Sequence, residues 1–148
     1  MFARPTVSML CALLLVVNSA AGAAALAQSL EIKLQDTSTD PSLAHMSIVL
    51  DQATIKAGRV TLRAENQSKT LVHEVVIARD DGAKELPMDA KHARVNESRV
   101  RRLGEIADLA PGTSGKLTVN LKPGAYVLFC NEPGHYQDRM FTKLTVAP

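Results

Sequence analysis

Apolar and polar residues alternate with a period of two along most of the chain after residue 28. The alternation is clearest where Leu30, Ile32 and Leu34 are separated by polar residues, and it recurs through the last third of the sequence. Period-two runs rich in β-branched and aromatic residues predict half-buried strands. These alternating runs, together with short apolar, β-branched or aromatic runs, predict strands over residues 29–34, 46–50, 60–64, 72–78, 116–121, 125–130 and 141–146.

Short turn sequences punctuate these runs and indicate how the strands are connected. Ala57-Gly58, Asp81-Gly82 and Pro123-Gly124 lie between predicted strands, as does a Gly-rich and Ser-rich segment at 111–115. Glycine, proline and aspartate favour tight turns. Several short strands at regular spacing predict an all-β protein, a Greek-key β-sandwich or barrel.

One segment, residues 84–109, interrupts the strand pattern. It is long, charged and richer in helix-forming residues, and it includes the basic run Arg99-Val100-Arg101-Arg102. Long insertions in small domains are often functional loops. We expect an irregular or partly helical insertion here, and a solvated flap over one edge of a sheet is favoured over a docking patch for an acidic partner.

The first 27 residues have the features of a secretory signal peptide. A basic start with Arg4 precedes a short apolar run, and the segment ends in Ala25-Leu26-Ala27. The apolar run is shorter than the roughly 20 residues that a membrane-spanning helix needs. We therefore expect residues 1–27 to be a signal peptide and residues 28–148 to form one domain without a membrane span that is exported, to the periplasm or to another exported compartment.

Charge and cysteine content narrow the function of this domain. Cleavage after Ala27 leaves 16 basic and 15 acidic residues, a balance that argues against a nucleic-acid partner. Cys130 is then the sole cysteine, in a compartment where thiols tend to form disulfides. A lone thiol there is explained by burial, by an intermolecular bridge or by a metal.

The segment from Cys130 to Met140 favours the metal. Cys130, His135 and Met140 are each separated by four residues, and Pro133-Gly134 predicts a tight turn before the histidine. A loop between two strands can direct a thiolate, an imidazole and a thioether to one point. These are the donors that copper prefers.

His73 is the best candidate for a further ligand. It begins an apolar run in which His73, Val75 and Ile77 share one face, so its ring is expected at the rim of the sandwich. Two imidazoles, one thiolate and a weakly bound thioether form the ligand set of a blue-copper site. The predicted metal ligands are His73, Cys130, His135 and Met140, with one copper ion per chain.

Cys-x-x-Pro-Gly-His followed by Met resembles the C-terminal copper loop of the cupredoxins, and the spacing is most similar to the rusticyanin-type loop. The order His, Cys, His, Met and the Pro-Gly turn before the cysteine strand extend this resemblance over residues 47–146. It implies a Greek-key β-sandwich with copper near one end. It further implies a one-electron carrier acting with a redox partner protein.

Two positions depart from the pattern that the resemblance implies. Glu74 follows His73 where the family commonly has Asn, so its carboxylate is expected to accept hydrogen bonds near Asn131 and to lower the reduction potential; coordination of copper by Glu74 is the alternative. Arg139 precedes Met140 where Gly is frequent, which leaves the position of the thioether open.

A second function remains compatible with the same residues. A copper-tolerance protein that sequesters or delivers periplasmic copper to a copper-handling partner needs the same ligands. An enzyme is not expected, because the chain has four histidines and no His-x-His pair with which to build further copper sites. We expect a monomeric copper protein without catalytic residues.

Overall fold

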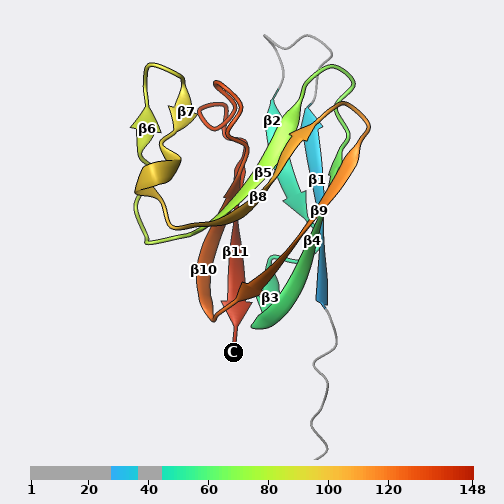
Figure 1. Ribbon diagram of the computed structural model, residues 1–148, viewed down its shortest axis with the longest axis vertical. Helices are drawn as coiled ribbons and strands as arrows, with labels where there is room; N and C mark the ends of the chain where they lie inside the picture. The colour runs from blue at the N-terminus through green and yellow to red at the C-terminus, as the bar shows by residue number, and fades with distance from the viewer. Residues whose placement is uncertain (1–27, 37–44) are drawn as a thin grey trace, which may run out of the picture.

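The computed structural model describes residues 28–36 and 45–148, which form two packed β-sheets with a separate two-stranded hairpin (Figure 1). The predicted signal peptide falls on residues 1–27, outside the described residues. The elements are β1 (Gln28–Asp36), β2 (Met46–Leu50), β3 (Thr54–Lys56), β4 (Gly58–Asn66), β5 (His73–Arg79), β6 (Met88–Asp89), β7 (Arg94–Val95), the 3₁₀ turn η1 (Glu97–Arg99), β8 (Arg102–Leu109), β9 (Ser114–Leu121), β10 (Gly124–Phe129) and β11 (Phe141–Ala147).

The two sheets are mixed. The first has the strand order β2-β1-β4-β9 and the second has the order β3-β11-β10-β5-β8. β1 is parallel to β4 and β3 is parallel to β11, whereas the other pairs are antiparallel. The chain passes between the two sheets five times, from β2 to β3, β3 to β4, β4 to β5, β8 to β9 and β9 to β10. This arrangement confirms the predicted all-β sandwich.

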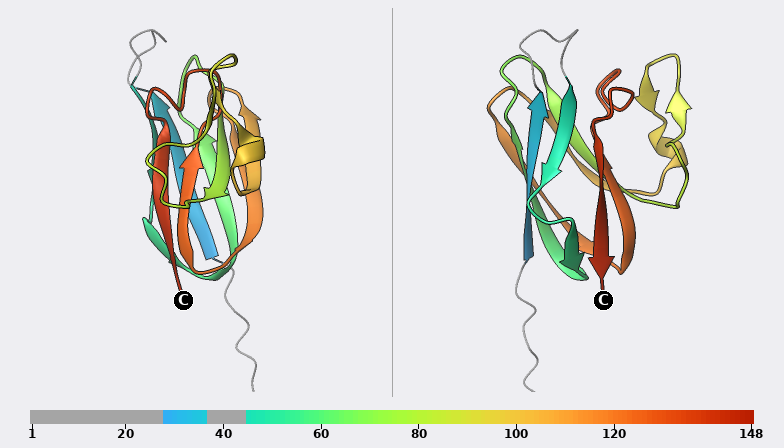
Figure 2. Two further views of the ribbon diagram at one scale, coloured as in Figure 1. Left: turned by 90° about the vertical axis from the view of Figure 1, so that its left-hand side faces the viewer. Right: turned by 180° about the vertical axis from the view of Figure 1, so that it is seen from behind.

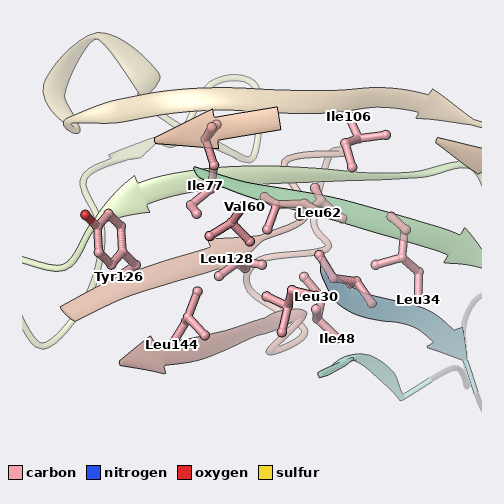
Figure 3. Close-up of a cluster of buried hydrophobic side chains, with 14 of the residues drawn as sticks. Leu30, Leu34, Ile48, Val60, Leu62, Ile77, Ile106, Tyr126, Leu128 and Leu144 are labelled. Carbon is pink, nitrogen blue, oxygen red and sulfur yellow. The ribbon is translucent and has the colours of Figure 1, made fainter. Parts of the chain in front are cut away.

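An apolar core fills the space between the sheets (Figure 3). Leu30, Ile32 and Leu34 of β1 point inward, while the residues between them are exposed. Val60 and Leu62 of β4 show the same alternation and are fully buried. Burial of these side chains drives the packing of the sheets, because transfer of apolar surface from water is the main stabilising term in folding.

β5 differs because both of its faces are buried. His73, Val75 and Ile77 face the core, whereas Val76 and Ala78 belong to a second apolar cluster on the outer face of the sheet. Residues 80–101, which we call the flap, cover this outer face with β6, β7 and η1 (Figures 1 and 2). The predicted irregular insertion is confirmed for the flap, and its helical part is the single turn η1.

The predicted insertion was wrong for residues 102–109, which form the edge strand β8. The buried residues of β8 are Ile106 and Leu109, three positions apart. A bulge in the pairing with β5 adds one residue between them, and Asp108 takes a positive φ of 49°. The bulge shifts the alternation out of phase, so a period-two pattern is absent from the sequence.

Among the described residues, no helix is long and apolar enough to cross a membrane.

Candidate metal centre

His73 and Cys130 lie at the same end of the five-stranded sheet. β5 begins at His73, and Cys130 directly follows β10. These strands are antiparallel neighbours, so the start of one lies beside the end of the other. The segment 130–140, which we call the donor loop, connects β10 to β11 at this end (Figure 1).

Three of the four predicted ligands converge there. The Cys130 Sγ lies 3.3 Å from His135 Nδ1 and 3.9 Å from His73 Nδ1, and the two Nδ1 atoms are 3.2 Å apart. Their rings are inclined at 62°. No other group of at least three His, Cys, Asp or Glu side chains in the described part of the chain brings potential metal-binding atoms so close together.

Backbone hydrogen bonds inside the donor loop place Met140 next to these residues. The Met140 N–H donates to His135 O, and the Cys130 N–H donates to Met140 O, each at 3.0 Å. The Met140 side chain is fully buried in the same apolar cluster as Cys130. The loop therefore folds back so that the backbone of Met140 is hydrogen-bonded to the backbones of both Cys130 and His135.

Two residues of the donor loop have left-handed backbone. Gly134 has φ 84°, as the predicted Pro-Gly turn requires, and its N–H donates to Ala93 O of the flap at 2.8 Å. Arg139 has φ 67°. This conformation suits glycine and costs another residue about 1–2 kcal/mol. The departure at Arg139 thus leaves the backbone in the conformation that a glycine would favour.

Burial determines the protonation of the candidate ligands. It lowers the pKa of His73 to about 4, with a further contribution from His135, and lowers the pKa of His135 as well. Both rings are neutral at pH 7, so each has a lone pair for a metal. Burial also raises the pKa of the Cys130 thiol to about 12, although the Glu74 N–H, 3.4 Å from Sγ, opposes the shift.

These donors fit a copper ion. Metal bonds to imidazole and thiolate are about 2.0–2.3 Å long, so ligands around one ion lie roughly 3–4 Å apart. The three observed separations fall in this range. One soft sulfur with two imidazoles, and a thioether nearby, suits both Cu(I) and Cu(II). Metal binding deprotonates a coordinating thiol despite its high pKa.

Glu74 lies outside this group of donors. Its side chain points to the outer face of the sheet, as alternation predicts, and is 7% exposed. Burial, together with the charges of Glu132, Glu97 and Glu105, raises its pKa to about 7. The hydrogen bonds expected between its carboxylate and the region of Asn131 do not form in the described structure; its backbone N–H instead faces Cys130.

Asn131 makes its hydrogen bonds to the flap. Its Oδ1 accepts the Val95 N–H at 2.6 Å, and its Nδ2 donates to Val95 O and to Glu97 Oε1. Arg94 pairs with Glu132 at 3.1 Å. The flap is therefore bound to the donor loop through polar contacts as well as through its apolar side chains.

Sequence reasoning missed Asp36. This residue ends β1, and its side chain is 7% exposed. Its Oδ2 lies 3.6 Å from Nε2 of His73. A signal was present, because Asp36 continues the inward-facing row of Leu30, Ile32 and Leu34. A carboxylate in phase with a core row indicates a buried partner.

Comparison with known proteins supports the fold. No protein-family model and no curated protein matches the chain. Among solved structures, auracyanin from Roseiflexus castenholzii has a TM-score of 0.57 and 22% identity, over 82% of this chain and 98% of that one. Rusticyanin from Thiobacillus ferrooxidans gives 0.56 and 17%, over 81% and 78%. An azurin from Methylomonas sp. strain J gives 0.56 and 16%, over 82% and 98%.

Auracyanins, rusticyanin and azurin are cupredoxins. Another similar structure, auracyanin A from Chloroflexus aurantiacus, is that of a "blue" copper protein. At these identities the likeness establishes the fold. The predicted resemblance to the cupredoxins is confirmed at that level.

Proposed function

We propose that this chain, which has the cupredoxin fold, is a one-electron carrier that holds one copper ion through His73, Cys130, His135 and Met140. The observation that supports the proposal most directly is the convergence of one thiol and two neutral imidazoles within 3.2–3.9 Å. Bound copper supplies one-electron chemistry between Cu(I) and Cu(II).

The surroundings of the donors suit this role. His73, Cys130 and Met140 are fully buried, and hydrogen bonds to the flap and within the donor loop fix the remaining ligand segment. A site whose ligands are held by packing changes little when the charge of the metal changes. A small rearrangement on oxidation and reduction favours fast electron transfer.

His135 is the proposed contact with a redox partner. Unlike the ring of His73, its side chain is only partly buried, and it lies in the turn that follows the exposed Pro133. An electron can thus reach the site through the imidazole edge without opening the core. We assign no catalytic residue to the proposed electron carrier.

The proposal also includes export of the mature domain. The sequence features of residues 1–27 support their removal as a signal peptide, leaving a periplasmic domain of residues 28–148. We propose that the mature domain is a monomer that meets a redox partner or a copper-handling protein there, with no nucleic acid and no membrane span.

The test is the visible and electron-spin-resonance spectrum of the copper-loaded mature protein. We expect intense thiolate-to-copper absorption in the Cu(II) form and its complete loss in Cys130→Ser. Met140→Leu is expected to keep the colour and raise the reduction potential, whereas Met88→Leu in the flap serves as the matched control and leaves both unchanged. A colourless Cu(II) complex, or an unchanged spectrum in Cys130→Ser, contradicts the site.

Electron self-exchange distinguishes the carrier from the copper-tolerance alternative. A carrier is expected to show reversible voltammetry and fast self-exchange between its Cu(I) and Cu(II) forms. Tight Cu(I) binding without reversible cycling would instead assign the site to sequestration or delivery.

A further inference from the structure

Asp36 and His73 form a buried pair on the side of the ring away from the other donors. Their side chains are 7% and 0% exposed, and Asp36 Oδ2 lies 3.6 Å from His73 Nε2. Within the described part of the chain, neither atom has a hydrogen-bond partner. Two buried polar atoms left without partners are costly, and here the two atoms lie 3.6 Å from each other.

The chemistry of the pair determines the tautomer of His73. A neutral imidazole has one N–H and one lone pair, and an ionised carboxylate can only accept a hydrogen bond. The proton therefore belongs on Nε2, facing Asp36. The lone pair then lies on Nδ1, which faces Cys130 Sγ and His135 Nδ1.

We propose that Asp36 is a positioning residue for His73: its carboxylate accepts the Nε2–H, fixes the ring with Nδ1 directed at the metal centre and lowers the reduction potential of bound copper. The inference rests on the proposed function for its effect on copper. The step from 3.6 Å to hydrogen-bond length requires a shift of about half an ångström. Carboxylate–histidine–metal arrangements orient the ring and raise its basicity, and their loss weakens metal binding about 10–100-fold.

Two substitutions separate the charge of Asp36 from its hydrogen bond. Asp36→Asn keeps an oxygen that accepts the Nε2–H but removes the negative charge. Asp36→Leu removes both in a side chain of similar size. The structure also offers a matched control, because Asp89 and His92 form an exposed pair at 2.7 Å, far along the chain in the flap. Asp89→Asn makes the same chemical change there.

The first measurement needs no copper. Nitrogen-15 NMR of the metal-free wild-type protein at pH 7 is expected to show His73 protonated on Nε2. Asp36→Asn should retain this tautomer, and Asp36→Leu should produce a mixture. A His73 ring protonated on Nδ1 in the wild type would overturn the proposal, even if every variant failed to fold.

The second measurement uses the copper-loaded protein. Asp36→Asn is expected to raise the reduction potential, and Asp36→Leu to weaken Cu(II) binding about 10–100-fold. Asp89→Asn should change neither. Wild-type potential and Cu(II) affinity in both Asp36 variants, with metal-free NMR spectra that show an intact fold, would reduce Asp36 to a structural role.

The two proposals fail in different ways. If the wild-type protein binds no copper, the proposed function fails while the NMR result still decides the tautomer. If the wild type has the expected spectrum and the Asp36 variants match it in potential and affinity, only the positioning role fails.

Discussion

The two faces of β5 are buried to the same extent but by different means. On the inner face, His73 and Val75 pack into the core between the two sheets, where regular strands surround them. On the outer face, Glu74 and Val76 lie under the flap, which has two short strands and one 3₁₀ turn. One strand thus carries a candidate ligand on one side and a buried acid on the other.

The comparison shows that similar burial shifts the pKa values of two neighbouring residues of one strand in opposite directions. Burial penalises the charged form of each group, so it lowers the pKa of His73 to about 4 and raises that of Glu74 to about 7. At neutral pH the imidazole is neutral, and Glu74 is near the midpoint of its titration. The inner face therefore carries an uncharged imidazole that can bind a metal. The outer face carries a carboxylate whose negative charge destabilises the folded state.

The largest expected effect on stability comes from removing the buried charge of Glu74. The folded protein takes up a proton on Glu74 between pH 7 and 4.5 that the unfolded chain does not, so this residue destabilises the fold increasingly as the pH rises from 4.5 to 7, and most strongly above pH 7. Glu74→Gln should raise the free energy of unfolding of the metal-free protein by at most about 3 kcal/mol at pH 8, and by almost nothing at pH 4.5. Urea denaturation at a series of pH values measures the difference.

Once the Glu74 carboxylate is removed, the pH dependence of stability that remains comes from His73. It has the opposite sign to that of Glu74. The unfolded chain protonates His73 between pH 6.5 and 4 whereas the folded chain does not, so stability falls as the pH is lowered through this range. Glu85→Gln, at an exposed flap position, is the control and should follow the wild-type profile. If the stability of Glu74→Gln also followed the wild-type profile, the carboxylate would not be buried as described.

In the copper-loaded protein, Glu74→Gln is expected to raise the reduction potential, because a nearby negative charge favours Cu(II).

A smaller effect compares the packing of the two faces. Val75 and Val76 are adjacent, are both fully buried and lose the same atoms on substitution by alanine. Val75→Ala should cost about 2–3 kcal/mol, because the strands around it cannot close the cavity, whereas Val76→Ala should cost about 1–2 kcal/mol, because the flap can settle into the space. Equal losses in urea denaturation would show that the flap packs as rigidly as the core.

The smallest effect tests one contact of the flap. The Tyr136 hydroxyl accepts the Leu86 N–H at 3.0 Å, which joins the flap to the donor loop. Tyr136→Phe should lower the free energy of unfolding by about 0.5–1.5 kcal/mol and speed hydrogen exchange at the Leu86 amide, with little change in the copper spectrum.

Tyr126→Phe provides the matched control for this contact. The Tyr126 hydroxyl donates to Lys122 O at 2.7 Å at the start of β10, away from the donor loop. Its loss should cost similar stability but leave exchange at Leu86 unchanged. Unaltered exchange at Leu86 in Tyr136→Phe would mean that other contacts alone hold the flap.

Strands with regular alternation or a continuous apolar run were predictable from the sequence, and the bulged and very short strands were not. β1, β2 and β4 follow the predicted ranges closely because each has one buried and one exposed face. β8 was missed because its bulge breaks the period, and β3 because three residues give too short a pattern. The flap was predicted to be irregular. Its polar contacts with the donor loop through Asn131 and Arg94 could not be predicted, because they produce no local pattern in the sequence.

By itself, the sequence determined the chemical types of the donors and their local order. Cys130, His135 and Met140 lie within one short loop, where spacing and a turn are enough to indicate that their side chains can meet. Only the tertiary structure decided that His73, 57 positions before Cys130, brings its Nδ1 to 3.9 Å from the sulfur. Only it placed Asp36 behind the ring and Glu74 under the flap. Alternation is a local property of a strand, whereas strand register and burial depend on segments far apart in the chain, and these set the distances and the pKa values.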